Sequence, residues 1–164
     1  MTNKIVVLSA GHDSVKDCGA VAKDGTTEAE MVTQFRNAVA YYVQQDKGVH
    51  VKVGGYGKSN LPLREAVKLI NGSVIAIEWH MNAAESPTAQ GVEVLSQDKD
   101  KVISQKIAKS IADVVGSKLR GEKGWKSESS GQHSRLAWVS NKGIIVELEF
   151  ISNPSFKGFS PAAS

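Results

Sequence analysis

The chain has 164 residues, of which 41% are hydrophobic and 23% are charged, and its formal net charge at pH 7 is +3. This composition is typical of one soluble domain with a substantial core. The charge is too small, and its lysines and arginines too scattered among acidic residues, to favour a nucleic-acid-binding protein. The single cysteine, Cys18, excludes an internal disulfide and a CxxC metal knuckle.

The sequence indicates neither a membrane anchor nor an export signal. No apolar stretch approaches the roughly 20 residues of a membrane span, so stable membrane insertion is not expected. The apolar run Ile5–Leu8 leads directly into Gly11 and His12, and cleaving this segment as a signal peptide would remove a predicted central strand. We therefore expect synthesis in the cytoplasm without a signal peptide of its own.

The first half of the chain alternates strand and helix patterns. Ile5–Leu8 is a short continuous apolar run, typical of a strand that is covered on both faces. Thr27 and Glu30 fit a capping box, and apolar residues then recur at helical spacing as far as Val43. Val49–Val53 alternates as a strand and is followed by a glycine-rich loop at 54–57.

The second half repeats this alternation and completes an α/β pattern. A helix is predicted from Pro62 to Ile70, another over 102–115, and a long polar loop over 120–135. Further strands are predicted at residues 74–79, 91–95, 136–139 and 144–151. Strands that alternate with helices predict a single three-layer α/β domain, with a mostly parallel or mixed twisted sheet of about six strands and helices on both faces.

Two histidines follow predicted core strands. His12 comes after Gly11, which permits a sharp turn, and His80 ends the strand at 74–79. Either histidine alone is more often an ordinary hydrogen-bonded side chain than a metal ligand. In an open α/β sheet, however, side chains at the ends of neighbouring strands converge in one crevice. The pair therefore indicates a hydrolytic metal site.

Glu28 is a candidate third ligand. It lies in the first turn of the predicted helix, where a carboxylate is also favourable simply because of the helix dipole. Glu30 already accounts for capping, so Glu28 is spare. Two histidines and one glutamate form a known catalytic zinc set with an open fourth position. The HExxH helix motif is absent, so the ligands must come from separate elements. Zinc suits these donors best, although cobalt or manganese can substitute.

Glu147 interrupts an otherwise apolar strand. Its neighbours Ile145 and Glu149 share one strand face, so a half-exposed strand is one interpretation. The alternative is a carboxylate held near the metal, where it takes a proton from bound water and passes it to a leaving nitrogen. Partial desolvation would raise its pKa and suit it to that role near neutral pH.

Several short motifs occur in order along nearly the whole chain. They are Ser9-Ala-Gly-His12, Cys18-Gly-Ala20, Gly25-Thr-Thr-Glu28-Ala with Phe35-Arg-Asn37 downstream, Leu63-Arg64, His80-Met-Asn82-Ala-Ala84 with Gly91-Val-Glu-Val94, Arg120-Gly121, and Val146-Glu147-Leu-Glu-Phe-Ile-Ser-Asn-Pro154. Each motif is weak alone, but this order is specific. The chain resembles the zinc-dependent N-acetylmuramoyl-L-alanine amidases, a family that includes the catalytic domains of phage endolysins and bacterial cell-wall amidases.

The resemblance implies a function for most of these residues. Residues 1–164 would form a single catalytic domain without a separate cell-wall-binding domain. His12, Glu28 and His80 would bind one zinc ion, and Glu147 would be the catalytic acid and base. The substrate would be peptidoglycan, cleaved at the amide between the lactyl group of N-acetylmuramic acid and the L-alanine of the stem peptide. We expect a monomer that binds no nucleic acid.

Two further residues are candidates for substrate binding. Asn82 lies two positions after His80 and is expected to orient the substrate beside the metal. Arg64, from the Leu63-Arg64 motif, either binds the substrate or pairs with a carboxylate in a structural role.

The chain departs from the family pattern at three places. Asp13-Ser14 stand where glycines are usual, and the loop to Gly19 is one residue longer. Glu78 replaces a small hydroxyl residue, and it either orients His80 from behind or only lines the sheet. Glu149 stands where glycine is usual. None of these changes removes a ligand.

Other functions remain open at this point. A zinc peptidase that cuts within the stem peptide could use the same ligands, and a wall-binding domain without activity is a further alternative. The polar loop at 120–135 leaves little room for the autoinhibitory helix of some cell-division amidases. We therefore favour a phage endolysin that acts on the cell wall in the periplasm after release, with a bacterial remodelling amidase as the alternative. His133 is interpreted as a surface histidine or as a residue over the cleft.

Overall fold

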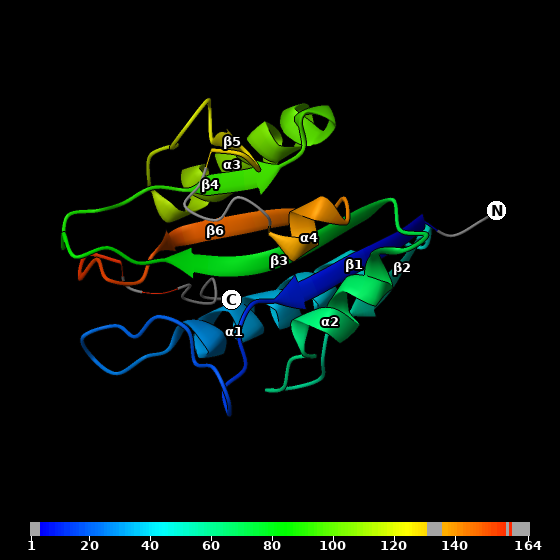
Figure 1. Cartoon of the computed structure of the whole chain (residues 1–164), viewed down its shortest axis with the longest axis horizontal. Helices are drawn as coiled ribbons and strands as arrows, with labels where there is room; N and C mark the ends of the chain where they lie inside the picture. Colours follow the sequence, from blue (N-terminus) through cyan, green and yellow to red (C-terminus); the bar gives the residue numbers. More distant parts are fainter. Residues whose placement is uncertain (1–3, 131–135, 157, 159–164) are drawn as a thin grey trace.

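The computed structural model describes residues 4–130, 136–156 and 158. Six strands form one sheet in the order β2-β1-β3-β6-β4-β5. Their bounds are β1 Lys4–Ala10, β2 Val49–Val53, β3 Ile75–Asn82, β4 Glu93–Ser96, β5 Trp125–Ser127 and β6 Ile144–Phe150. Strands β2, β1, β3 and β6 run parallel, β4 is antiparallel to β6, and β5 is parallel to β4 (Figure 1). The sheet is therefore mixed, as predicted.

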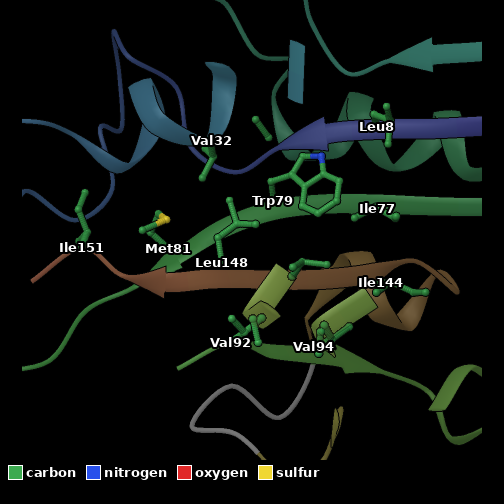
Figure 2. Packing of buried hydrophobic residues seen from close by; sticks show 14 of the residues in the cluster. Leu8, Val32, Ile77, Trp79, Met81, Val92, Val94, Ile144, Leu148 and Ile151 are labelled. Atoms are coloured by element: carbon green, nitrogen blue, oxygen red, sulfur yellow. The ribbon is translucent and has the colours of Figure 1, made fainter. Parts of the chain in front are cut away.

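The helices cover both faces of this sheet. The two long helices, α1 (Glu28–Val43) and α3 (Lys101–Val115), pack on one face against a core that includes Leu8, Trp79 and Leu148 (Figure 2). The short elements pack on the other face, namely α2 (Leu63–Ala66), the 3₁₀ helix η1 (Val67–Ile70) and α4 (Ala137–Ser140). No helix in the described ranges is both long and apolar enough to cross a membrane.

The capping box predicted at the start of α1 is present. The backbone N–H of Glu30 donates to the Thr27 hydroxyl, and the Thr27 N–H donates to the Glu30 carboxylate. This cap fixes Glu28 as the first residue of the helix. The Glu28 side chain accepts the Met81 N–H of β3 and lies 3.2 Å from His12, which follows β1, so the start of α1 lies at the carboxyl ends of these two strands.

Two predictions for the sequence after residue 116 were wrong. Residues 136–139 begin the helical turn α4 instead of forming a strand, because Trp138 and Val139 both pack into the second core and a strand would separate them. The sixth strand is instead β5, which lies in the region predicted as a loop and pairs with β4. A short polar edge strand has too few apolar residues to show a period. His133 lies outside the described residues.

The helix predicted from Pro62 to Ile70 is one α-helical turn followed by a turn of 3₁₀ helix. The end of this segment matches the prediction, since Asn71 and Gly72 follow it and Gly72 has a φ of 78°. Ala66 and Ile70 anchor the segment to the second core.

Candidate metal centre and active site

His12, Glu28 and His80 converge at the carboxyl ends of β1 and β3. Each residue offers one ligand atom, and these three atoms lie within 4.8 Å of one another. The Nε2 atom of His12 lies 3.2 Å from Oε2 of Glu28, and the Nδ1 atom of His80 lies 3.2 Å from Oε1 of Glu28. The structure thus brings together the three residues that the sequence pointed to.

His80 is held in strand β3, where it is partnered with Glu147 of β6 just before the pairing of the two strands changes register. Its ring lies over Gly11, where a Cβ atom would approach the ring carbon Cε1 to 2.0 Å, so only glycine fits beneath it. The Nε2 atom of the ring lies 3.0 Å from the carboxylate of Glu78, which is buried. Metal-binding histidines commonly place their second nitrogen on a carboxylate in this way.

Glu28 is fixed by backbone donors on either side. The Met81 N–H donates to Oε1 at 2.9 Å, and the Ala20 N–H donates to Oε2 at 3.1 Å. Gly19 makes room for the carboxylate, because a Cβ there would lie 2.6 Å from Oε2 of Glu28. The carboxylate is therefore oriented by the chain before any cation binds.

His12 is held by a loop in a left-handed conformation, with a φ of 67°. Such a φ is unfavourable for a residue with a Cβ and is maintained only where the surroundings enforce it. Asp13 and Asp17 exchange backbone hydrogen bonds of 2.7 and 2.9 Å, which closes residues 13–17 into a tight turn. This turn places the Asp17 carboxylate 3.0 Å from Nδ1 of His12.

A buried polar network holds the His12 backbone from below. Asn60 donates through Nδ2 to the His12 carbonyl at 2.9 Å and to the Thr33 hydroxyl at 3.0 Å. The fully buried Arg36 donates in turn to Oδ1 of Asn60 and to backbone carbonyls of the loop at 54–59. Neither periodicity nor sequence motifs indicate a role for Asn60 or Asp17, because Asn60 acts on a residue 48 positions away and Asp17 acts within an irregular turn.

The electrostatics of the three candidate ligands favour a cation between them. Burial raises the pKa of Glu28, but hydrogen bonds with His12 and His80 outweigh this and hold its pKa well below the usual range. The hydrogen bond with Glu28 raises the pKa of His12. Burial lowers the pKa of His80, but Glu28 and Glu78 outweigh it and raise its pKa well above the usual value. Without a metal, the Glu28 carboxylate therefore favours protonation of both histidines. A bound metal ion would take the place of these two protons.

Glu147 lies next to His80 on the neighbouring strand β6, at the partnered register position. Burial raises the pKa of its carboxyl to about 7. Its Oε2 atom is buried and has no hydrogen-bond partner among the described residues. A buried carboxylate oxygen without a hydrogen-bond partner is costly and calls for a functional explanation. The group is placed to exchange a proton with a molecule bound beside His80.

The remaining candidates have the following places. Asn82 ends β3 beside Glu93. Burial would raise the pKa of the Glu93 carboxyl, but hydrogen bonds with Lys126, Arg120 and, more weakly, Asn82 lower it. Arg64 is exposed in α2 and forms no ion pair within the described residues. Glu149 is buried and accepts the Gly91 N–H at 2.6 Å.

Comparison with protein families identifies the chain. The model of the N-acetylmuramoyl-L-alanine amidase family matches residues 6–157. The chain belongs to this family. It is therefore an enzyme, an amidase that acts on peptidoglycan, and this supports the amidase interpretation over a stem-peptide peptidase or an inactive wall-binding domain. A search of curated proteins found no significant match.

Solved structures agree with this assignment. A Neisseria meningitidis protein assigned as an N-acetylmuramoyl-L-alanine amidase is 49% identical, with 93% of this chain and 82% of that chain covered and a TM-score of 0.84. The catalytic domain of CwlV from Paenibacillus polymyxa var. colistinus is 22% identical, with 94% and 84% covered and a TM-score of 0.80. An amidase from Clostridium difficile 630 is 20% identical, with 96% and 85% covered and a TM-score of 0.81. The last two support the fold alone.

The residues of this amidase fit a zinc ion. Two imidazole nitrogens and one carboxylate oxygen are the donor set of many hydrolytic zinc sites. The second nitrogen of each imidazole lies 3.0 Å from a carboxylate oxygen, Asp17 for His12 and Glu78 for His80. These carboxylates fix the ring orientation and raise ligand basicity.

Proposed function

We propose that this amidase is zinc-dependent, with His12, Glu28 and His80 as the metal ligands and Glu147 as the catalytic acid and base. The observation that carries the proposal is the convergence of three ligand atoms within 4.8 Å of one another, next to the buried and unpartnered Oε2 of Glu147. The bond cleaved joins the lactyl group of N-acetylmuramic acid to the L-alanine of the stem peptide.

The chemistry divides between the metal and the chain. When bound, zinc supplies a Lewis acid for the scissile carbonyl and lowers the pKa of water. Glu147 holds the proton taken from the attacking water and delivers it to the nitrogen of L-alanine as the amide breaks. Its pKa of about 7 lets it accept and release a proton near neutral pH.

Three other side chains support these steps. Glu78 holds the His80 ring in position through the contact at Nε2. Asn82, which ends β3 beside Glu93, orients the substrate. Arg64, exposed on α2, contacts the outer part of the substrate.

The test combines metal content with product analysis. Purified protein is expected to contain about one zinc per chain and to release peptides with a free L-alanine amine from peptidoglycan, as seen by mass spectrometry. Chelation should abolish this activity and added zinc should restore it, while Glu147→Ala should keep its zinc and lose activity. Full activity in the metal-free protein would refute the mechanism.

We further propose that the enzyme serves phage-induced host lysis. The described part of the loop after α3, residues 116–130, contains no helix, which supports an amidase that is active without release from autoinhibition. The purified protein should then lyse outer-membrane-permeabilised cells at full rate without an added activator. Weak activity that rises strongly with a bacterial activator protein would favour the cell-wall remodelling role instead.

A further inference from the structure

The row of side chains that contains Glu147 continues away from the metal ligands. His80, Glu147 and Glu93 occupy partnered positions on β3, β6 and β4. Lys126 on β5 is partnered with Leu95, two residues after Glu93 and on the same face. One face of the sheet therefore carries the candidate metal donors at one end of the row and a cationic residue at the other.

Two cationic side chains, Arg120 and Lys126, lie at the β4–β5 end of this row and contact Glu93. Arg120 donates through Nε to Oε2 of Glu93 at 2.6 Å, and the Lys126 Nζ lies 2.8 Å from the same oxygen. The Arg120 guanidinium lies 4.8 Å from the centre of the Phe150 ring. Gly91 allows this packing, because a Cβ there would lie 2.6 Å from Cγ of Arg120. The sequence motifs that contain Gly91 and Arg120 supply no candidate metal ligand, and the structure brings them into contact with each other.

Both cations retain donors that the protein does not use. Glu93 takes one donor from each, and the Nη groups of Arg120 have no hydrogen-bond partner among the described residues. The side chains of Arg120 and Lys126 are 33% and 28% exposed. The nearby Glu149 accepts the backbone N–H groups of Gly91 and Phe150 through one carboxylate oxygen, Oε1. The forked edge of a guanidinium beside an ammonium group suits a carboxylate ligand.

The roles of the metal centre and Glu147 fix the direction of the substrate. The scissile carbonyl lies at the metal ligands from β1, β3 and α1, and the departing amine lies at Glu147 on β6. The glycan side of the bond therefore extends toward β1, and the peptide side extends toward β4 and β5. This step rests on the proposed function of Glu147.

We propose that Arg120 and Lys126 form a subsite for the α-carboxylate of the second stem-peptide residue. Neighbouring strands are about 4.8 Å apart, and an extended residue spans about 3.5 Å, so the residue after L-alanine reaches β4. In a stem whose second residue is D-glutamate joined through its γ-carboxyl, the α-carboxylate is free. In a stem with D-isoglutamine that group is a neutral amide. The subsite discriminates between these two stems.

The experiment compares two soluble substrates, N-acetylmuramoyl tripeptides that carry D-glutamate or D-isoglutamine as the second residue. Wild-type enzyme should favour the carboxylate substrate by roughly tenfold in kcat/KM, the size expected for a charge-assisted hydrogen bond. Lys126→Met keeps the Arg120–Glu93 pair and should bring this ratio toward one, mainly by raising KM for the carboxylate substrate. Lys109→Met, which removes an exposed lysine on α3, should leave the ratio unchanged.

The outcomes separate the subsite from the proposed function. If wild-type enzyme cleaves both substrates at the lactyl amide with equal kcat/KM, the amidase function stands and the subsite is wrong. The same conclusion follows if Lys126→Met lowers both values by the same factor. If the wild-type enzyme cleaves neither substrate at that bond, the proposed function itself fails. Thermal melting of each variant checks that the fold is intact.

Discussion

His80 and His12 each offer one ring nitrogen to the candidate metal centre, Nδ1 from His80 and Nε2 from His12, and they do so from different kinds of backbone. His80 lies in a strand that is paired on both sides, and the carboxylate behind it, Glu78, is 7% exposed. His12 lies in a loop at a φ of 67°, and the carboxylate behind it, Asp17, is 67% exposed. The strand-held half of the site depends on close packing, whereas the loop-held half depends on hydrogen bonds to the backbone.

The largest effect is expected from Gly11→Ala, which adds a Cβ within 2.0 Å of the His80 ring. The His80 ring is held by Glu28 and Glu78, and Gly11 is held by the bond from its N–H to the Trp79 carbonyl, so neither group can move far. Zinc affinity and kcat/KM should therefore fall by roughly a hundredfold or more. Zinc titration and the peptidoglycan assay measure this, with Gly48→Ala as the control because no atom approaches that position closer than 3.4 Å. Unchanged zinc affinity in Gly11→Ala would mean that His80 is not tightly packed.

The loop-held half is tested by Asn60→Ala. This change leaves the His12 carbonyl, the Thr33 hydroxyl and the buried Arg36 each without one partner. Unfolding free energy should fall by about 3 kcal/mol, and zinc affinity by roughly tenfold as His12 loses its enforced conformation. Urea denaturation and metal competition provide the measurements. Asn141→Ala, at an exposed residue, should change neither quantity by much, and equal effects of the two variants would contradict the network.

A direct comparison of the two halves uses Glu78→Gln and Asp17→Asn. Both remove a charge that orients an imidazole, but Glu78 is buried and Asp17 is largely exposed. Glu78→Gln should weaken zinc binding by roughly ten- to a hundredfold, whereas Asp17→Asn should weaken it only a fewfold because solvent screens the exposed pair. The zinc dissociation constants of both variants are measured at the same pH. A larger loss of affinity in Asp17→Asn than in Glu78→Gln would contradict the expected order.

The smallest expected effect concerns Glu147 on the strand-held side. Its folded pKa of about 7 exceeds the ordinary value of 4.5, so the folded state binds more protons between these pH values. The stability of the metal-free protein should therefore decrease as pH rises from about 4.5 to 7. Glu147→Gln should remove roughly 2 kcal/mol of this decrease. Unfolding free energies at pH 5 and pH 8 test it, and parallel pH profiles for both proteins would show that Glu147 is not desolvated.

Strand and helix periodicity predicted the parts of the site that regular structure positions. The capping box placed Glu28 at the start of α1, and the strand ends placed His12, His80 and Glu147 near one edge of the sheet. Asp17 and Asn60 were missed because they act on His12 through a turn and through a contact between residues 48 positions apart. Periodicity carries no signal for either. The short elements β5 and α4 were misassigned because three or four residues are too few to show a period.

The antiparallel direction of β4 has a consequence for how this enzyme can diversify. Because β3 ends and β4 begins at the catalytic side of the sheet, the connection at 83–92 starts and finishes there. It is tied down by a bond from the Ala84 N–H to the Ser152 hydroxyl and by one from Asn153 to the Ala89 carbonyl. An insertion between these two tethers would extend the protein surface beside the site while the strands that carry the candidate catalytic groups keep their positions. This connection is the natural place to graft new recognition segments.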